Sequence, residues 1–419
     1  MHMRRREFLA AGALSLRAAA GAMPRRATKG SMIRSIALAP AECRFHKFVA
    51  MNSYDTAPKG HTYSNTLVRI RTGDGAEGVG VMGYTAPDAA FLQALRTLIG
   101  ADTLRLYDMK EGRITGRAPE YAAGLKAYRH LDGPLFDLIG KLTRKPAWQL
   151  LGTAARERVE VYDGTLYFSD VWFPRLGAKA VVEEVQEALK KGYRGVKLKI
   201  ARGSKWMERE AGTARDIEVT LAVRRAAGPG LKIQVDGNNG YRDHHDHVWR
   251  YLNETAAAKV YWIEEMFPEN IAHYTALKDR MEKAGLNILI AEGETEREIA
   301  AFEPYLKPRR LFDVVQLDIR TAGFLDNVAL AHAAEAAGAV SVPHNWGSYV
   351  GGLMGLHLSK AVRAVVAAED DRSRCDVVQA EGYEFKDGLI AVGNAPGLGL
   401  QVDEKLYEMK CKKAEVRVE

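Results

Sequence analysis

The chain has 419 residues, a formal net charge of +7 and a pI of about 9.1. Its apolar fraction of 47% and charged fraction of 27% are those of a globular protein and exclude a disordered or collagen-like chain. No apolar run reaches the roughly 18 residues that a transmembrane helix needs, so we expect no membrane span. The three cysteines have no CxxC spacing, which argues against a zinc cluster or a disulfide scaffold, and we expect them to be inert.

The basic charge is concentrated at the N-terminus. Residues 1–30 carry a net charge of +6, which leaves about +1 for the rest of the chain. A nearly neutral body lacks the basic surface that a phosphate backbone requires, so we expect no nucleic-acid partner.

The leader has a charged start with Arg5-Arg6, a weakly apolar middle and a small-residue exit over Ala18–Ala22. This pattern resembles a twin-arginine export signal, and the alternative interpretation is a disordered basic tail. We therefore expect residues 1–30 to be an export leader and linker. The protein is then expected to be periplasmic or otherwise exported by this route, with a cytoplasmic location as the alternative.

A small α+β domain is predicted over residues 40–152. Asn65–Gly75 has apolar residues two positions apart and ends in a Gly-Asp-Gly turn, which indicates a β-hairpin. Residues 87–152 then show apolar spacings of three and four, which indicate helices.

From residue 155 onward, short β-type runs alternate with helical stretches. These runs are Val159–Phe168, Val196–Ile200, Lys232–Asp236, Val260–Glu264, Ile288–Glu294, Val314–Asp318, Ala339–His344 and Val365–Glu369. Eight such units with nearly continuous apolar strands predict an α/β fold with a parallel (β/α)₈-type, TIM-like barrel over residues 155–375. A doubly wound sheet is the alternative, although no Gly-x-Gly-x-x-Gly opens a helix after a strand. We expect the final segment, 376–419, to pack back on the N-terminal domain.

Seven consecutive predicted strands end in an ionisable residue, at the rim where barrels of this type carry their active sites. Alternation places Lys197 and Lys199 on the same face of the second strand. Asp236, Glu264 and Glu294 follow at the next three strand ends and form an oxygen-rich set suited to Mg²⁺. No Cys or His lies near these carboxylates in sequence, which disfavours zinc.

Candidate bases flank this predicted metal site. Paired ammonium groups lower each other's pKa, so we expect Lys199 to act as a base. Asp318 precedes His344 by one strand and is expected to orient its imidazole and raise its basicity. Glu369 is a candidate hydrogen-bonding acid if its surroundings keep it protonated, and Glu381 is the alternative eighth-strand acid. Two bases beside a metal suit proton removal from the carbon next to a carboxylate, because the metal stabilises the enediolate.

Other charged residues near these strand ends have less specific interpretations. Glu265 and Glu292 are expected to be rim or supporting charges rather than ligands. The run His244–His247 has metal-ligand chemistry, but it lies where a helix begins after the third strand. We favour a surface helix start for this run, with an adventitious metal site and a substrate-binding loop as alternatives.

Taken together, these motifs resemble the enolase superfamily, in particular its mandelate racemase and muconate lactonizing enzyme-like subgroup, over roughly residues 40–405. Lys197-Leu-Lys199 is similar to the family's Lys-x-Lys, which implies that Lys199 is the base and Lys197 its modulator. The pair Asp318 and His344 resembles the family's His–Asp dyad. The resemblance also implies that the 40–152 domain caps the barrel and that the C-terminal segment completes this capping domain.

The three carboxylate motifs carry the same resemblance. They are Asp236-x-Asn238, Glu264-Glu265 and Ala291-x-Gly293-Glu294, and the third motif favours Glu294 over Glu292 as the ligand. One departure lies in the second motif, where the family usually has Glu-Glu-Pro but Met266-Phe267 here precede Pro268.

The resemblance implies a Mg²⁺-dependent enzyme acting on a small carboxylate substrate, and it implies a homo-oligomer. The favoured activity is dehydration of an acid sugar to a 2-keto-3-deoxy acid. The alternatives are a racemase or epimerase that uses Lys199 and His344 as opposite-face bases, and a non-catalytic barrel that retained its metal. The segment 51–65 is polar enough for a polyhydroxy acid, and the candidate substrate-binding residues are Asn238, Tyr54 and His61.

Overall fold

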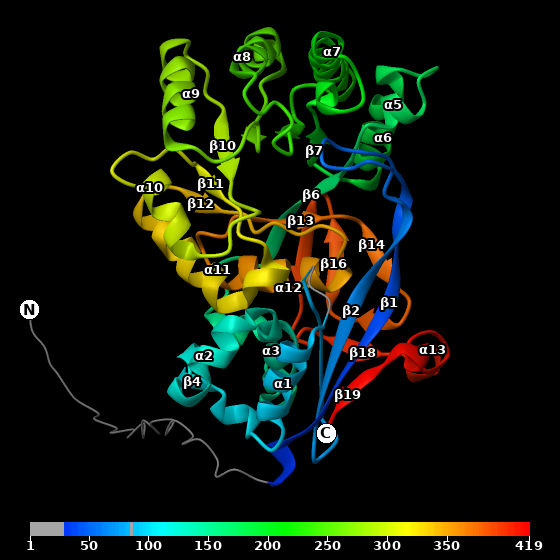
Figure 1. Ribbon diagram of the computed structural model, residues 1–419, viewed down its shortest axis with the longest axis vertical. Helices are drawn as coiled ribbons and strands as arrows, with labels where there is room; N and C mark the ends of the chain where they lie inside the picture. Colours follow the sequence, from blue (N-terminus) through cyan, green and yellow to red (C-terminus); the bar gives the residue numbers. More distant parts are fainter. Residues whose placement is uncertain (1–28, 84–86) are drawn as a thin grey trace, which may run out of the picture.

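The computed structural model describes residues 29–83 and 87–419 (Figure 1). The predicted export leader lies almost entirely outside the described residues. Among the residues described, no helix is both long enough and apolar enough to cross a bilayer.

The N-terminal domain is built on a twisted antiparallel hairpin. It pairs the long strands β1 (Ile33–Val49) and β2 (Gly60–Thr72). Strand β2 then continues through the predicted tight turn into β3 (Glu77–Val81). Helix α3 (Asp132–Thr143) covers this sheet closely, because a Cβ added at Gly80 would lie 2.3 Å from Pro134. The smaller elements are α1 (Ala89–Leu98), β4 (Tyr107–Lys110), β5 (Arg113–Arg117), α2 (Pro119–Ala127) and α4 (Ala147–Leu151).

Eight parallel strands form the second part of the molecule. They are β6 (Arg158–Leu166), β7 (Gly195–Lys199), β8 (Lys232–Asp236), β9 (Trp262–Glu264), β10 (Leu289–Glu292), β11 (Val314–Val315), β12 (Val340–Ser341) and β13 (Ala367–Asp370). Each of β6 to β11 pairs with the next strand, and β13 pairs with β6. Between β12 and β13 the pairing is reduced to one bridge, Ser341 with Val365, so the ladder is not continuous around the ring. The predicted α/β fold class is confirmed, and every predicted run overlaps one of these strands.

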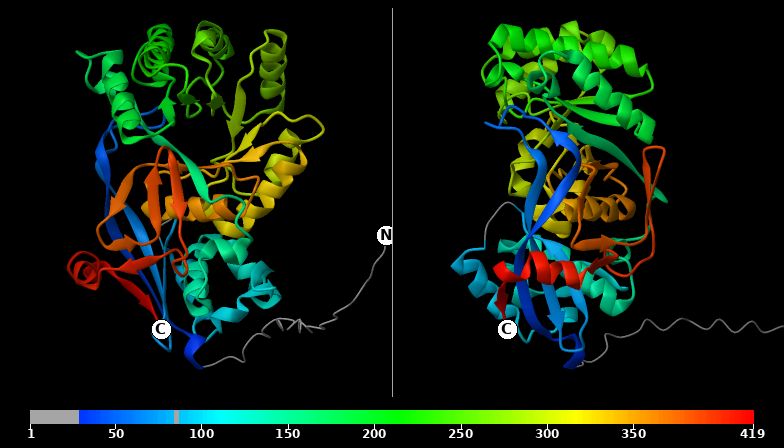
Figure 2. Two further views of the ribbon diagram at one scale, coloured as in Figure 1. Left: turned by 180° about the vertical axis from the view of Figure 1, so that it is seen from behind. Right: turned by 90° about the vertical axis from the view of Figure 1, so that its right-hand side faces the viewer.

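Helices separate the strands and surround the parallel sheet (Figures 1 and 2). They are α5 (Ser169–Trp172), α6 (Ala178–Lys191), α7 (Arg209–Ala227), α8 (His245–Glu254), α9 (Ile271–Lys283), α10 (Glu303–Leu306), α11 (Ile319–Ala336) and α12 (Tyr349–Ala361). The strands are buried on both faces, as the continuous apolar runs predict. Inward-facing side chains that include Tyr162 and Trp262 fill the interior, so the ring is packed and its chemistry is confined to one end.

The C-terminal segment serves both parts of the molecule. Strands β14 (Ser373–Cys375) and β19 (Val416–Val418) pair with β1 of the N-terminal sheet. The hairpin of β16 (Tyr383–Lys386) and β17 (Leu389–Val392) instead pairs with β6, through Leu389 and Glu160 among others. The remaining elements are β15 (Val378–Ala380), β18 (Leu400–Val402) and α13 (Glu404–Lys410).

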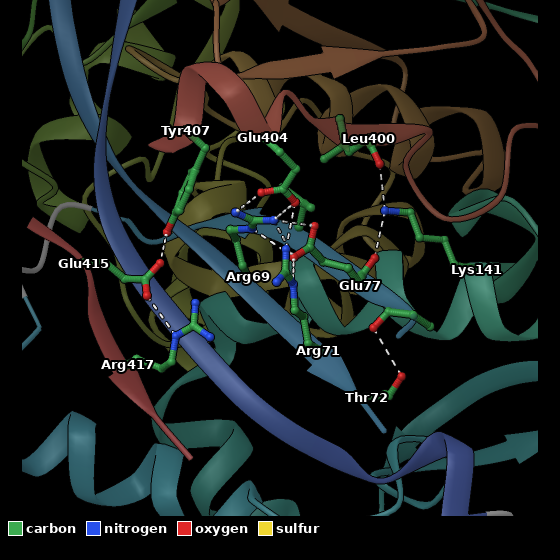
Figure 3. Close-up of polar contacts among 12 residues, drawn as sticks. Arg69, Arg71, Thr72, Glu77, Lys141, Leu400, Glu404, Tyr407, Glu415 and Arg417 are labelled. Carbon is green, nitrogen blue, oxygen red and sulfur yellow. Dashed lines mark hydrogen bonds and ion pairs between the residues drawn. The ribbon is translucent and has the colours of Figure 1, made fainter. Parts of the chain in front are cut away.

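An ion cluster joins α13 to the N-terminal sheet, and we call Arg69, Arg71, Glu77 and Glu404 the tail junction (Figure 3). Arg69 is 4% exposed and donates to Glu77 Oε1 at 2.9 Å and to Glu404 Oε2 at 3.2 Å. Arg71 donates to the same two carboxylates, at 2.6 and 2.7 Å. These bonds fix the chain's end beside β1 and β2, where Figure 2 shows it in both views.

The hairpin tip reaches the barrel at the end where the strands finish (Figure 1). Ser53 Oγ donates to the carbonyl of Ile200, just after β7, and the amide of Phe168 donates to the carbonyl of Met51. The N-terminal domain therefore contributes side chains to the same edge that carries the predicted catalytic residues.

Candidate active site

The strand register brings the predicted residues together at one end of the barrel. Asp236 at the end of β8 pairs in register with Lys199 of β7 on one side and with Glu264 of β9 on the other. Lys197 and Lys199 are both buried beneath this edge. Parallel strands thus convert a sequence spacing of about 30 residues into direct contact.

Each lysine is held by carboxylates. Lys199 Nζ bonds Asp236, whereas Lys197 Nζ lies 2.7 Å from both Glu264 Oε1 and Glu369 Oε1. Burial lowers the pKa of Lys199 and Lys197 lowers it further, but the carboxylates of Asp236, Glu294 and Glu264 together outweigh both and hold that pKa above its ordinary value. The expectation that the lysine pair alone makes Lys199 a base is therefore wrong for this state, because the carboxylates dominate its surroundings.

Four carboxylates crowd the mouth, and we call Asp236, Glu264, Glu265 and Glu294 the mouth carboxylates. One oxygen each of Asp236, Glu265 and Glu294 lie within 4.8 Å of one another. Glu264 is set apart from this trio by its contacts with Lys197 and with Trp262 Nε1 at 3.0 Å. The structure therefore places Glu265, expected as a rim or supporting charge, beside two of the predicted ligands.

The electrostatics of this cluster follow from its burial and its excess of negative charge. Burial and the neighbouring Asp236 raise the pKa of Glu265 to about 8. Burial, Glu265 and Asp236 hold the pKa of Glu294, which is 11% exposed, well above its usual range. Among the described residues, the buried amide oxygens of Asn238 and Asn239 have no hydrogen-bond partner. Clustered hard oxygen donors with surplus negative charge fit a divalent cation such as Mg²⁺.

His344 and Asp318 form the predicted pair. His344 Nδ1 lies 2.9 Å from Asp318 Oδ2, and His344 Nε2 lies 3.3 Å from Glu294 Oε2. Asp318 also caps α11 by accepting from the amides of Arg320 and Thr321, and Arg320 Nη2 lies 2.6 Å from its carboxylate. Despite burial, Arg320 and His344 hold the pKa of Asp318 well below its usual range. The ionised carboxylate accepts from Nδ1–H, which leaves Nε2 facing the mouth.

Glu369 lies at the mouth, whereas Glu381 is exposed in the C-terminal segment and its amide bonds the carbonyl of Gly399. Glu369 Oε2 accepts from the amide of Asn345 at 3.0 Å, and its other oxygen binds Lys197. Burial raises the pKa of Glu369, but Lys197 and His344 outweigh it and hold that pKa below its usual range. The predicted acid role required Glu369 to stay protonated, and its lowered pKa does not meet that condition. The Glu369 carboxylate instead binds Lys197.

The predicted substrate-binding residues separate into two groups. Tyr54, 43% exposed at the hairpin tip, donates to Glu265 Oε1 at 3.0 Å and accepts from Asn239 Nδ2. Asn238 Nδ2 donates to Glu265 Oε2 at 3.0 Å. His61 is exposed on β2, and its ring packs against Phe48. The structure thus brings Tyr54 and Asn238 into contact with Glu265, whereas the His61 ring contacts Phe48.

Aromatic residues that the sequence did not single out form one wall of the mouth. The ring of Tyr167 lies 5.3 Å from Lys199 Nζ and stacks on Trp346 at 4.8 Å. Tyr167 follows β6 and Trp346 follows β12, so their positions just beyond strand ends were the available signal. The same signal applies to Glu265, which follows β9 with a left-handed φ of 44°.

The two candidate bases reach the carboxylates from different strands. Lys199 contacts Asp236 from β7, and His344 contacts Glu294 from beyond β12. The carboxylates come from β8 to β10, between these strands in the sheet order. An acid–base pair that flanks a cation-binding cluster can remove a proton on one side of a bound carboxylate and deliver or remove one on the other.

Comparisons with known proteins identify the family of this chain. The sequence model of a family described as "Enolase C-terminal domain-like" matches residues 180–406. The chain is similar to arabinonate dehydratase of Saccharolobus solfataricus, with 26% identity over 364 residues that cover 84% of this chain and 92% of that protein. It is also similar to N-succinyl-L-Arg/Lys racemase of Bacillus cereus, with 24% identity covering 73% of this chain and 76% of that protein.

Solved structures of similar proteins superpose on most of this chain. The galacturonate dehydratase of a Geobacillus species, in complex with D-galacturonate and 5-keto-4-deoxy-D-galacturonate, superposes with a TM-score of 0.81 at 28% identity. The match covers 94% of this chain and all of that chain. A mutant of that enzyme in complex with Mg superposes with a TM-score of 0.80, also at 28% identity, covering 92% of this chain and 96% of that chain.

Proposed function

Because the chain belongs to the Enolase C-terminal domain-like family, within the enolase superfamily, we propose that it is a Mg²⁺-dependent acid sugar dehydratase. The observation that carries this proposal is the placement of Lys199 and His344 against different members of one carboxylate cluster. The dehydratases among the similar proteins, which act on arabinonate and galacturonate, support the substrate class.

Asp236, Glu264 and Glu294 are the residues that we propose hold the metal. A divalent cation bound there supplies positive charge that stabilises the enediolate of the substrate. Asp236 and Glu264 each bind a lysine ammonium group. A divalent cation carries the same total charge as these two ammonium groups and can take their place. Glu265 binds the neutral donors Tyr54, Asn238 and Asn239, so we assign it to positioning the site even though it lies nearer to Asp236 and Glu294.

The chain's own residues then divide the proton transfers. Lys199 acts as a base once its ammonium has released Asp236 and lost its proton, and it takes the proton from the α-carbon of the substrate. His344 acts as the imidazolium: Asp318 accepts from its Nδ1–H, and its Nε2–H gives the proton to the β-hydroxyl as the carbon–oxygen bond breaks. Water leaves, and the resulting enol tautomerises to the 2-keto-3-deoxy acid. Glu369 holds Lys197 in place beside the reacting centre.

The test is a screen of the purified protein against a library of acid sugars, with Mg²⁺ or with a chelator, and with 2-keto acid formation as the readout. We expect at least one acid sugar to give 2-keto-3-deoxy product with Mg²⁺ and none with the chelator. Absence of product across the library, with Mg²⁺ bound, would reject the dehydratase assignment.

A racemase or epimerase is the second candidate, because the same two groups on different sides of the cluster suit removal and return of one proton. Incubation in D₂O separates the two activities. A racemase exchanges the α-proton for deuterium and inverts the centre without forming a keto acid, whereas a dehydratase forms the keto acid.

For location, we propose export by the twin-arginine route, on the basis of the charged start, apolar middle and small-residue exit of residues 1–30. Changing Arg5-Arg6 to Lys-Lys is expected to retain the protein in the cytoplasm. Export that persists after this change would contradict the assignment. Self-association, which the resemblance implies, stays a prediction.

A further inference from the structure

A second group of possible metal ligands lies at the start of α8. It shares no residue with the mouth carboxylates, and two of its three members are histidines. His244 precedes the helix, and Asp246 and His247 lie in its first turn. One ligand atom from each of these three residues lies within 4.8 Å of the other two. The rings of His244 and His247 lie 5.7 Å apart between centroids.

His247 is already oriented as a metal-binding histidine. Its Nδ1 lies 2.9 Å from Thr213 Oγ1, and that hydroxyl donates its own hydrogen to the carbonyl of Arg209 at 3.1 Å. With the hydroxyl hydrogen given to Arg209, Thr213 Oγ1 accepts from Nδ1–H, and this is the tautomer in which Nε2 is free to bind a metal. Nε2 lies 4.0 Å from Asp246 Oδ2, and the His247 side chain is only 15% exposed. A hydrogen bond from the ring nitrogen that does not bind the metal is the usual way in which proteins fix a ligating imidazole.

The donor set identifies the class of ion. Two imidazole nitrogens and one carboxylate oxygen suit Zn²⁺ or a similar transition metal, whereas Mg²⁺ prefers oxygen donors. We propose that His244, Asp246 and His247 form a transition-metal site, most simply for Zn²⁺, with water at the remaining position. The favoured interpretation of this run from sequence, a surface helix start, describes its backbone correctly but leaves its side-chain arrangement unexplained.

Such an ion would fasten the loop between β8 and α8. This loop carries Asn238, which bonds Asp236 and Glu265, and Thr213 links His247 to α7. The bound ion would therefore hold together α7, the start of α8 and a loop that supports the mouth. The expected consequence is a more stable loop, measurable without reference to turnover.

A neighbouring pair of histidines provides a matched control. The rings of His245 and His273 lie 4.4 Å apart between centroids, and both pack against Phe267. This pair adjoins the proposed site but is not part of the three-residue ligand group. Its removal should leave the proposed site intact.

The experiment is a calorimetric Zn²⁺ titration of the whole protein with Mg²⁺ in excess, so that the mouth carboxylates hold Mg²⁺. We expect one tight Zn²⁺ equivalent in the wild type. His244→Ala and His247→Ala should each weaken it by more than about 10-fold, and Thr213→Val by about 10-fold. His245→Ala and His273→Ala should leave its affinity unchanged, and circular dichroism checks the fold of each variant.

Imidazole ¹⁵N spectra supply a second readout, in which Zn²⁺ should shift the His244 and His247 resonances and leave those of His273 in place. The proposal is overturned if the wild type has no tight Zn²⁺ equivalent or binds an adventitious ion only. It is also overturned if His247→Ala retains the equivalent, or if His273→Ala loses it.

Discussion

Two clusters of charge in this molecule, the partly exposed tail junction and the buried barrel mouth, differ in how their charges are balanced. At the tail junction, two arginines face two carboxylates, and each arginine bonds both (Figure 3). Burial raises the pKa of Glu404, but Arg69 and Arg71 outweigh it and hold that pKa below its usual range. At the barrel mouth, four carboxylates and Glu369 surround only two lysines, and the pKa of Glu265 rises to about 8.

The difference separates a structural cluster from a functional one. The tail junction neutralises itself, so it needs nothing from outside and fixes the end of the chain. The mouth carries negative charge that the protein does not balance, and burial makes that imbalance costly unless a cation or protons supply the missing charge. A buried cluster with surplus charge of one sign is therefore the better indicator of a binding site.

The largest expected effect follows from removing the base. Lys199→Ala should lower kcat by about 10²–10⁴-fold, because no other group takes the α-proton, while Mg²⁺ binding and folding persist. Steady-state kinetics with calorimetry measures both quantities. Lys283→Ala, an exposed lysine at the end of α9, is the matched control and should keep full activity. Unchanged turnover in Lys199→Ala would remove Lys199 from the mechanism.

Loss of the acid should have a different signature. His344→Asn should lower keto acid formation by about 10²–10⁴-fold while Lys199 still exchanges the α-proton of the substrate with solvent. Mass spectrometry and NMR in D₂O measure product and exchange separately. If exchange and product formation fall together, His344 does more than protonate the leaving hydroxyl.

Metal affinity sharpens the roles of the two adjacent glutamates. Glu264→Gln should weaken Mg²⁺ binding by about 10–100-fold, because it removes a ligand charge, whereas Glu265→Gln should weaken it by less than about 10-fold. Calorimetric titration of each variant measures the difference. The reverse order would transfer the ligand role to Glu265, as its distance from Asp236 and Glu294 alone suggests.

At the tail junction the expected effect is on stability only. Arg69→Met removes the buried one of the two arginines that Glu77 and Glu404 share, leaves Arg71 as their partner, and should cost about 2 kcal/mol of unfolding free energy. Chemical denaturation measures this loss, and Mg²⁺ affinity and kcat should stay at wild-type values. A change in Mg²⁺ affinity would show that the two clusters are coupled.

The smallest expected effect is a pH dependence of stability in the metal-free protein. The folded pKa of Glu265, about 8, lies above its unfolded value of 4.5, so the folded state binds the proton more tightly. The stability from this group is present below pH 4.5 and is lost as the pH rises toward 8. The thermal midpoint in a chelator should therefore fall by a few degrees between pH 5 and pH 8. Glu265→Gln should flatten this slope, and an equal slope in both proteins would contradict the assignment.

The sequence predicted the strands and the mouth residues well because both depend on local pattern. Continuous apolar runs mark strands buried on two faces, and the parallel arrangement brings their last residues together. The ionisation states could not be predicted in the same way. They depend on Asp236 bonding Lys199 and on Lys197 and Asn345 bonding Glu369, which are contacts between strands.

The contacts of Glu265 and Tyr167 could not be predicted for a related reason. Both residues lie just beyond a strand end, where a turn decides the direction of the side chain. A left-handed φ at Glu265 is set by the loop and has no marker in a Glu-Glu-Met-Phe sequence. Likewise, the pairing of β17 with β6 depends on a long connection that the apolar pattern does not specify.

The most direct test of the contrast between the two clusters is Mg²⁺ titration at pH 7 in two buffers of different ionisation enthalpy. The pKa of Glu265, raised to about 8 by burial and Asp236, means that the metal-free mouth holds a proton at this pH. We expect one bound Mg²⁺ per chain, and we expect its binding to release protons. Asp236→Asn should abolish both the binding and the proton release. Absence of Mg²⁺ binding, or binding that Asp236→Asn leaves intact, would contradict it.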